Sequence, residues 1–258
     1  ALIQIGTNFA NDYYDAIQGA DTDDREGFTR VTQAGLIEPG QVKAAMYLTF
    51  AAAVVVGSYL VYVGGVPILV IGLLSVISGI AYTGGPYPLG YHGLGDLFVF
   101  VFFGVIAVTG TYYVQAAAVL AAPLTTTIPP GTITLEAVVA SLPIAAISTN
   151  ILVVNNIRDK AEDETTGKRT LAVRFGYGFS RAEYIGLLAV AYLVPVWLWL
   201  ATDFSMIVLL PLVTLPVAIR VAETIRTETS GAALNPALET TGKLLAGYAL
   251  LFGVGLAV

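Results

Sequence analysis

The 258-residue chain is 56% hydrophobic and only 12% charged, and its mean hydropathy is +0.78. Soluble globular domains carry about 25% charged residues, so this composition excludes a soluble domain and indicates a polytopic membrane protein. The chain has no cysteine, which excludes disulfides, thiolate zinc sites and cysteine nucleophiles, and its single histidine, His92, cannot build a histidine-rich metal site. Five of the 18 acidic residues fall into two Asp motifs, and the remaining 13 nearly balance the 12 Lys and Arg, so the net charge of −6 reflects these motifs.

Apolar stretches long enough to cross a hydrocarbon core of about 30 Å recur along the chain. They lie at roughly 44–63, 66–82, 97–121, 134–154, 183–201, 205–222 and 241–258. Residues 1–17 are typical of the last part of an earlier stretch, and because the chain opens at Ala1 without Met, we expect it to be truncated at its N-terminus. The sequence therefore predicts an all-α, polytopic transmembrane helical bundle. No soluble linker separates its halves, so we expect residues 1–258 to form a single domain.

Gly and Pro punctuate residues 83–96, a pattern that is incompatible with a helix. At membrane depth such backbone is tolerated only where it lines a cavity or is buried in protein. Residues 156–182 and 226–239 are charged or polar and are expected to be connections between helices, whereas 122–133 is an uncharged turn.

The basic residues are confined to alternate connections. All 12 Lys and Arg lie in or beside residues 18–43, 156–182 and 220–243, and the other connections hold none. The positive-inside rule places such basic connections in the cytoplasm. We therefore expect an integral protein of the plasma membrane whose active site faces the cytoplasm.

Two motifs rich in Asp and Asn each close an apolar stretch. Their members are Asn11, Asp12, Asp15 and Asp21 in the first motif and Asn155, Asp159 and Asp163 in the second. Residues four apart on a helix share a face, so Asp159 and Asp163 point the same way. Acids in a membrane protein are costly and mark functional sites by default. The repeated pattern of Asn, three residues and Asp predicts two related halves with both acid clusters at the mouth of one cavity.

Carboxylates in this arrangement suit magnesium. Mg²⁺ takes hard oxygen ligands and is usually held by one or two carboxylates together with substrate phosphates. Lys168 and Arg169, next to the second motif, are cationic donors of the kind that binds phosphate. The sequence therefore favours a diphosphate bridged by Mg²⁺, with the apolar tail of a lipid substrate lying among the helices.

An allylic tail would leave a carbocation when the diphosphate departs, and aromatic faces can stabilise such a cation. Tyrosines near the cytoplasmic connections or on the helices behind them are the candidates, namely Tyr13, Tyr14, Tyr82, Tyr87, Tyr91, Tyr112 and Tyr113. Most of these are expected to be packing residues or interfacial anchors, with only two or three lining the cavity.

The segments at residues 8–21, 82–96 and 155–170 together resemble the UbiA superfamily of intramembrane prenyltransferases, and the likeness covers the whole chain in order. Within the superfamily, the chain most resembles the members that act in menaquinone synthesis. The resemblance implies a nine-helix bundle, of which about eight helices are represented here, and a polyprenyl diphosphate bound through Mg²⁺. It also implies transfer of the polyprenyl group to 1,4-dihydroxy-2-naphthoate with loss of CO₂, which gives demethylmenaquinone and diphosphate.

Carried over by position, the resemblance implies metal ligands at Asp12, Asp15, Asp21, Asp159 and Asp163. The wider superfamily has an acid four residues after Asp15, where this chain has Gly19, and Asp21 is the expected substitute.

Catalytic roles are expected for Asp15, Tyr82, Asp163 and Lys168. Substrate contacts are expected from Asn11, Tyr87, Tyr91, His92, Lys168 and Arg169. The partners are then a polyprenyl diphosphate, a small aromatic acceptor and the lipid bilayer, with no nucleic acid.

Other interpretations stay open. Another transferase of the same superfamily would use 4-hydroxybenzoate, homogentisate, chlorophyllide or a glycerol phosphate as acceptor. A secondary transporter would place its acids near the membrane midplane in broken helices, rather than at the cytoplasmic ends beside bases. Asp12 or Asp15 could instead cap a helix or pair with Arg25, His92 could be a hydrogen-bonding loop residue, and Asp96 could cap the next helix.

Overall fold

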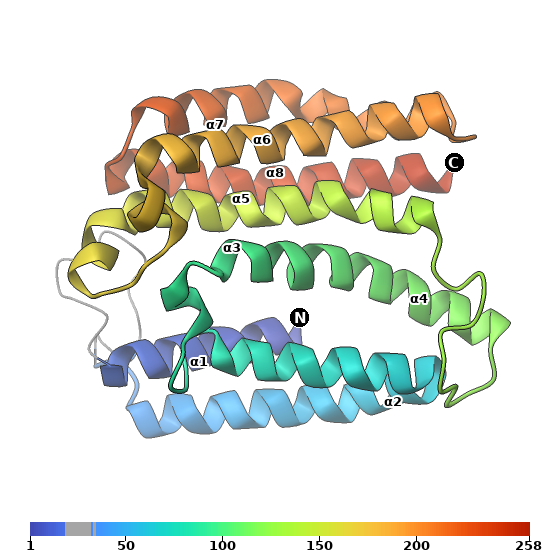
Figure 1. The fold of residues 1–258 in the computed structure, drawn as a ribbon, viewed down its shortest axis with the longest axis horizontal. Helices are drawn as coiled ribbons and strands as arrows, with labels where there is room; N and C mark the ends of the chain where they lie inside the picture. The colour runs from blue at the N-terminus through green and yellow to red at the C-terminus, as the bar shows by residue number, and fades with distance from the viewer. Residues whose placement is uncertain (19–31, 33–34) are drawn as a thin grey trace. The chain divides into compact units, whose positions relative to one another are not determined.

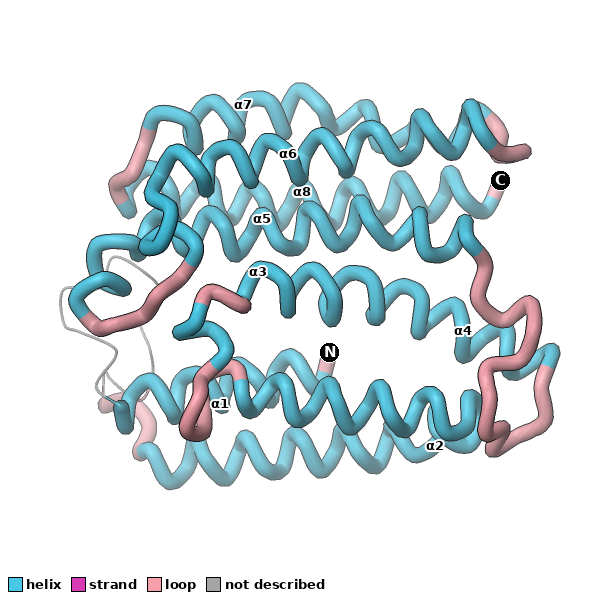
Figure 2. Tube along the Cα trace, in the orientation of Figure 1, coloured by secondary structure: helices cyan, strands magenta, loops and turns pink. Residues whose placement is uncertain are grey.

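The computed structural model describes residues 1–18, 32 and 35–258, and within them the regular structure is helical throughout (Figure 1). Figure 2 shows the described loops between the helices, among them the long connection between α4 and α5. The elements are α1 (Leu2–Gln18), α2 (Pro39–Ala81), η1 (Leu89–His92), α3 (Gly95–Phe98), η2 (Val99–Ile106), α4 (Ala107–Leu120), α5 (Leu135–Thr165), α6 (Leu171–Ala201), η3 (Met206–Thr214), α7 (Leu215–Thr227) and α8 (Gly231–Ala257).

Among the described residues, six helical runs are long and apolar enough to cross a membrane. They are Pro39–Ala81, Gly95–Leu120, Leu135–Thr165, Leu171–Ala201, Met206–Thr227 and Gly231–Ala257. This confirms the predicted all-α, polytopic transmembrane bundle. Because the first run is interrupted at Gly65, these runs and α1 amount to eight helical segments in the described part of the chain.

The chain reverses direction within α2, so that its two halves run in opposite directions (Figure 1). The reversal is at Gly65, whose φ of 68° and ψ of −156° are accessible to Gly at little cost. Val66 N donates a hydrogen bond to Thr125 O at 2.8 Å, and Leu124 N donates to Tyr62 O at 3.0 Å. The loop after α4 thus satisfies backbone groups that the turn leaves without helical partners. The halves of α2 correspond to the stretches predicted at 44–63 and 66–82.

The described chain divides into two compact units. Unit 1 comprises residues 1–95, 110–133 and 162–170, and unit 2 comprises residues 96–109, 134–161 and 171–258.

In unit 1, α1 packs on α2 around buried Ala10, Met46 and Phe50. Glycines allow the close approach: a Cβ on Gly6 would lie 2.9 Å from the Phe50 ring, and a Cβ on Gly79 would lie 2.4 Å from the Thr7 hydroxyl. This packing places the polar last turns of α1 next to the segment that follows α2.

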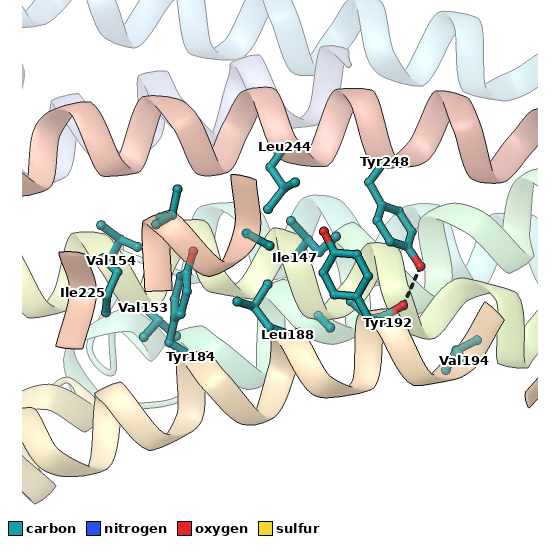
Figure 3. Packing of buried hydrophobic residues seen from close by; sticks show 14 of the residues in the cluster. Ile147, Val153, Val154, Tyr184, Leu188, Tyr192, Val194, Ile225, Leu244 and Tyr248 are labelled. Carbon is teal, nitrogen blue, oxygen red and sulfur yellow. Dashed lines mark hydrogen bonds between the residues drawn. The ribbon is translucent and has the colours of Figure 1, made fainter. Parts of the chain in front are cut away.

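The core of unit 2 is formed by α5, α6, α7 and α8 (Figure 3). Their inward faces carry Ile147, Val153, Val154, Tyr184, Leu188, Tyr192, Ile225, Leu244 and Tyr248. The buried hydroxyls are satisfied inside this core. Tyr248 donates to Ala191 O, and Tyr184 shares a hydrogen bond with Thr241. Such pairing removes the penalty for burying a polar group in an apolar core.

Two predicted connections are wrong. Residues 156–182 are mostly helical, since α5 continues to Thr165 and α6 begins at Leu171, and of 226–239 only residues 228–230 lie outside α7 and α8. The Glu, Lys, Arg and Ala residues of these segments favour helix. Charge shows where the chain leaves the apolar layer, and these helices continue beyond that point.

The expected loop at 83–96 also contains helical turns. Residues Leu89–His92 form a 3₁₀ helix that follows Pro88 and ends at Gly93, whose φ is 71°. Pro fixes the entry and Gly supplies the left-handed exit, so a single short turn fits between them.

Candidate active site

The first Asp motif occupies the last turns of α1 in unit 1. Asp12 and Asp15 are 5% and 2% exposed. Asn11 and Asp15 are four residues apart and share one helix face. Thr83 donates a hydrogen bond to Asn11 Oδ1 at 3.0 Å, and the Tyr91 hydroxyl donates to Asp15 Oδ1 at 2.6 Å. The motif is therefore held against the Gly- and Pro-rich segment after α2.

Lys168 forms an ion pair with this motif. Its Nζ lies 3.6 Å from Asp15 Oδ2 and 5.0 Å from the centre of the Tyr91 ring. The backbone of the next residue is fixed to the same tyrosine, because Arg169 N donates to Tyr91 O at 2.8 Å. A carboxylate, an ammonium group and an aromatic face therefore meet at one point.

The two carboxylate oxygens of Asp12 have different surroundings. Its Oδ2 accepts a hydrogen bond from Thr32 at 3.0 Å, whereas its Oδ1 is buried and has no hydrogen-bond partner among the described residues. An unpaired oxygen of a buried carboxylate is costly. It is a hard, anionic group of the kind that a divalent cation satisfies.

The acids of the second motif have different surroundings. Asp163 belongs to unit 1, is 8% exposed and accepts a hydrogen bond from Thr170 at 3.5 Å. Asp159 belongs to unit 2 and is 7% exposed, and Arg158 Nε donates to its Oδ1 at 2.6 Å. Both acids are carried by α5, and both are buried.

Tyr87 and His92 form a stacked pair, with ring centroids 3.5 Å apart and planes inclined by 20°. His92 Nδ1 lies 2.8 Å from Pro88 O, so a proton on Nδ1 is donated to this carbonyl and leaves Nε2 as an acceptor. The pair offers a flat apolar face next to a polar ring nitrogen. Tyr82 lies on the same segment, where Gly90 N donates to Tyr82 O at 2.8 Å.

The structure brings together Asn11, Asp15, Tyr91, Lys168 and Arg169 in unit 1. Asp12 lies on the same helix. Asp21 lies outside the described residues, and so does Arg25, the alternative partner that the sequence suggested for Asp15.

The structure also gives the surroundings of Tyr113 and Asp96, two further residues that the sequence suggested. Tyr113 is 2% exposed and its hydroxyl donates to Gly64 O at 2.8 Å, which makes it a packing residue at the α2 turn. Asp96 lies in the first turn of α3 rather than before it, and its Oδ1 is buried with no hydrogen-bond partner in the described chain.

Several polar partners of the motifs were not found from the sequence, namely Thr32, Thr83, Arg158 and Asn235. Thr32, Thr83 and Arg158 each contact a motif residue directly, and Asn235 contacts Arg158. Single Thr and Asn residues carry no distinctive spacing, so no sequence signal could have selected the two threonines or Asn235. Arg158 lies inside the second motif, and its place beside Asp159 was the one available signal.

The donor set fits Mg²⁺ that is held jointly with a phosphate. Among the described residues there is no group of three His, Cys, Asp or Glu close enough to hold a metal alone. Mg²⁺ commonly takes only one or two carboxylates and completes its shell with substrate phosphates and water. Asp12 offers an oxygen that has no hydrogen-bond partner in the described part of the chain, and Asp15 lies three residues further along α1. These two acids could hold the ion from one side.

The sequence model of the UbiA prenyltransferase family matches residues 1–237. The chain is 38% identical over 253 residues to 1,4-dihydroxy-2-naphthoate octaprenyltransferase of Mycobacterium tuberculosis, covering 98% of this chain and 80% of that protein. It is 34% identical over 261 residues to the protein of the same name from Escherichia coli, covering 98% and 80%. It is 31% identical over 258 residues to human UbiA prenyltransferase domain-containing protein 1, covering 97% and 69%.

Solved structures agree in fold. The apo structure of a UbiA homologue from Aeropyrum pernix superposes with a TM-score of 0.65 at 14% identity, covering 99% of this chain and 85% of that one. A structure of digeranylgeranylglyceryl phosphate synthase superposes with a TM-score of 0.60 at 13% identity, covering 98% and 81%. These identities support the fold alone, whereas the family match and the closer relatives confirm the resemblance inferred from the sequence. The chain is an integral membrane protein that belongs to the UbiA prenyltransferase family.

Proposed function

We propose that this protein transfers a polyprenyl group from an allylic diphosphate to 1,4-dihydroxy-2-naphthoate in a Mg²⁺-dependent reaction of menaquinone synthesis. The family match and the names of the bacterial relatives support the reaction class and the acceptor. The structural observation that carries the proposal is the meeting of Asp15, Lys168 and Tyr91 in unit 1. We further propose that the protein lies in the plasma membrane with this site open to the cytoplasm.

The polar residues of unit 1 bind and orient the diphosphate in this proposal. Asp12 and Asp15 hold the metal, while the Lys168 ammonium and the Arg169 guanidinium donate to phosphate oxygens. Mg²⁺, when bound, supplies positive charge that stabilises the departing diphosphate. Tyr91 keeps the Asp15 carboxylate in one orientation through its 2.6 Å hydrogen bond. Asp163 of unit 1 and Asp159 of unit 2 are the ligands that the family resemblance implies for the second motif.

Departure of the diphosphate breaks the bond between prenyl carbon and phosphate oxygen and leaves an allylic cation. The rings of Tyr82 and Tyr91 are the candidates for stabilising that cation without capturing it. The Tyr91 ring already has a cation over its face in the described structure, because Lys168 Nζ lies 5.0 Å from its centre. This contact with a cation supports a role for the Tyr91 ring in stabilising the allylic cation.

The aromatic acceptor is assigned to the segment that carries Tyr87 and His92. Their stacked rings offer surface to a fused bicyclic substrate, and His92 Nε2 can accept a hydrogen bond from a ring hydroxyl. The acceptor carbon that bears the carboxylate bonds to the prenyl cation. Loss of CO₂ then returns the electron pair to the ring and gives the hydroquinone form of demethylmenaquinone.

The family match supports treating residues 1–258 as one catalytic domain. It runs from residue 1 to 237 and includes residues of both compact units. The units are therefore proposed to act together rather than as separate domains.

A competition assay tests the acceptor. Membranes that contain the protein receive a polyprenyl diphosphate, Mg²⁺ and equal concentrations of 1,4-dihydroxy-2-naphthoate and 4-hydroxybenzoate, and the lipid extract is analysed by mass spectrometry. We expect the naphthoate-derived product to dominate, because a single ring loses stacking area and leaves polar groups unpaired. Tyr87→Ala should reduce this preference, and Tyr59→Ala, a change of an exposed tyrosine on α2, should not. Prenylated hydroxybenzoate as the main product would reject this acceptor.

Tyr91→Phe tests the orientation of Asp15. The variant retains the ring beside Lys168 and removes the hydroxyl that donates to Asp15 Oδ1. Hydrogen bonds to charged groups contribute about 1.5–3 kcal/mol, so we expect turnover to fall by roughly tenfold or more. Steady-state rates at saturating substrates measure this effect, with Tyr59→Phe as the matched control. Equal turnover in both variants would remove Tyr91 from the orientation of Asp15.

A further inference from the structure

Arg158 donates four hydrogen bonds inside unit 2. Its Nε donates to Asp159 Oδ1 at 2.6 Å and its Nη2 donates to Asp159 Oδ2 at 2.8 Å, which is a bidentate pair. Nη2 also donates to Asn155 Oδ1 at 2.7 Å, and Nη1 donates to Asn235 Oδ1 at 2.8 Å. The side chain of Arg158 is only 2% exposed. We call Arg158, Asn155 and Asn235 the Arg158 clamp.

The geometry of the clamp is not that of an ordinary surface ion pair. Consecutive residues on a helix point about 100° apart, so Arg158 and Asp159 do not face each other without further constraint. Asn155, one turn earlier on α5, and Asn235, in the first turns of α8, supply that constraint. Two amide oxygens therefore fix the guanidinium, and the guanidinium fixes the carboxylate.

The number of hydrogen bonds in the clamp shows which groups of Arg158 and Asp159 can still bind a ligand. A guanidinium has five N–H donors, and these bonds use four of them while the side chain is buried. Arg158 is thus a poor candidate for direct contact with a phosphate. Each oxygen of Asp159 receives one hydrogen bond from Arg158, and a carboxylate oxygen can accept two. One lone pair on each oxygen therefore stays available for a ligand.

We propose that Arg158 is a positioning residue, which fixes the plane of the Asp159 carboxylate and so the direction from which its remaining lone pairs meet a bound Mg²⁺, and that Asn235 anchors it from α8. This inference rests on the proposed function, because it concerns Asp159 as a metal ligand. Outer residues that orient metal-binding groups typically change metal affinity by about 10–100-fold when they are altered. A bidentate pair also requires the guanidinium fork, which Lys cannot reproduce.

Asn235→Ala and Arg158→Lys test the clamp in the purified protein in nanodiscs. The first readout is the binding of a non-reactive prenyl thiodiphosphate, measured by calorimetry at increasing Mg²⁺ concentrations. The second readout is kcat and the KM values for both substrates. The third is the melting temperature without metal. We expect the Mg²⁺ concentration for half-maximal binding to rise by about tenfold in both variants. The KM for the aromatic acceptor should not change. Glu239→Gln, a change of an exposed residue on α8, is the control and should match the wild type.

The outcomes are distinct. Unchanged Mg²⁺ dependence in Asn235→Ala and Arg158→Lys, while the wild type binds the analogue with Mg²⁺, would overturn the clamp and leave the proposed function standing. A raised KM for the prenyl diphosphate with unchanged Mg²⁺ dependence would place Arg158 on the phosphate and would also overturn the positioning role. A wild-type protein that neither binds the analogue with Mg²⁺ nor transfers a prenyl group would overturn both proposals. If Arg158→Lys melts early, Asn235→Ala decides, because it keeps the ion pair and removes one anchor.

Discussion

Replacement of Asp15 by Asn is expected to abolish nearly all turnover. Asp15 is 2% exposed and contacts both the Tyr91 hydroxyl and the Lys168 ammonium. Asn has nearly the same volume and keeps an oxygen to which Tyr91 can donate, so the variant removes charge rather than shape. Loss of one preorganised electrostatic contact in an active site costs roughly 10²–10³ in rate.

The same loss is expected for Asp163→Asn in the second motif, where the carboxylate is 8% exposed. Initial rates of prenyl transfer are measured over a range of Mg²⁺ concentrations, so that weakened metal binding is separated from a slower chemical step. Asp203→Asn is the control, because this acid is exposed between α6 and η3. Turnover near that of the wild type in Asp163→Asn at limiting Mg²⁺ would contradict a metal site shared by the two motifs.

Replacement of Gly65 by Ala is expected to cause the largest loss of stability. Gly65 has a φ of 68°, and a Cβ at this position would lie 1.9 Å from Thr125 O and 2.7 Å from Thr125 N. Backbone strain at a non-Gly residue of this conformation costs about 1–3 kcal/mol. The clash adds to this cost, because the loop must move and break the hydrogen bond from Val66 N to Thr125 O.

Thermal unfolding of the detergent-solubilised protein, followed by size-exclusion chromatography, measures this effect. Gly72→Ala is the matched control, since Gly72 also lies in α2 and a Cβ there meets nothing within 4 Å. Its melting temperature should equal that of the wild type or exceed it, because Ala favours helix more than Gly does. Equal melting of Gly65→Ala and Gly72→Ala would show that the turn tolerates a side chain and would refute this account of it.

The apolar stretches and the three segments that carry the family resemblance could be predicted from the sequence. Hydrophobic length is a local property, because every backbone group in a membrane must find its partner inside a helix. The turn at 64–65 followed from the same pattern, since Gly64 and Gly65 separate two apolar stretches of spanning length. The helix ends at 156–182 and 226–239 were predicted wrongly, because a charge marks the exit from the apolar layer and does not break a helix.

The sequence by itself determined an all-helical membrane protein with two Asp motifs, because composition and motif spacing are properties of the chain, and the resemblance of three segments identified it as a prenyltransferase. The tertiary structure alone decided which groups those acids meet. Tyr91 and Lys168 reach Asp15, and Asn235 reaches Arg158 across 77 positions of the sequence. The physical reason is that helical periodicity relates only residues on one helix, whereas these contacts depend on how separate helices and loops pack within each compact unit.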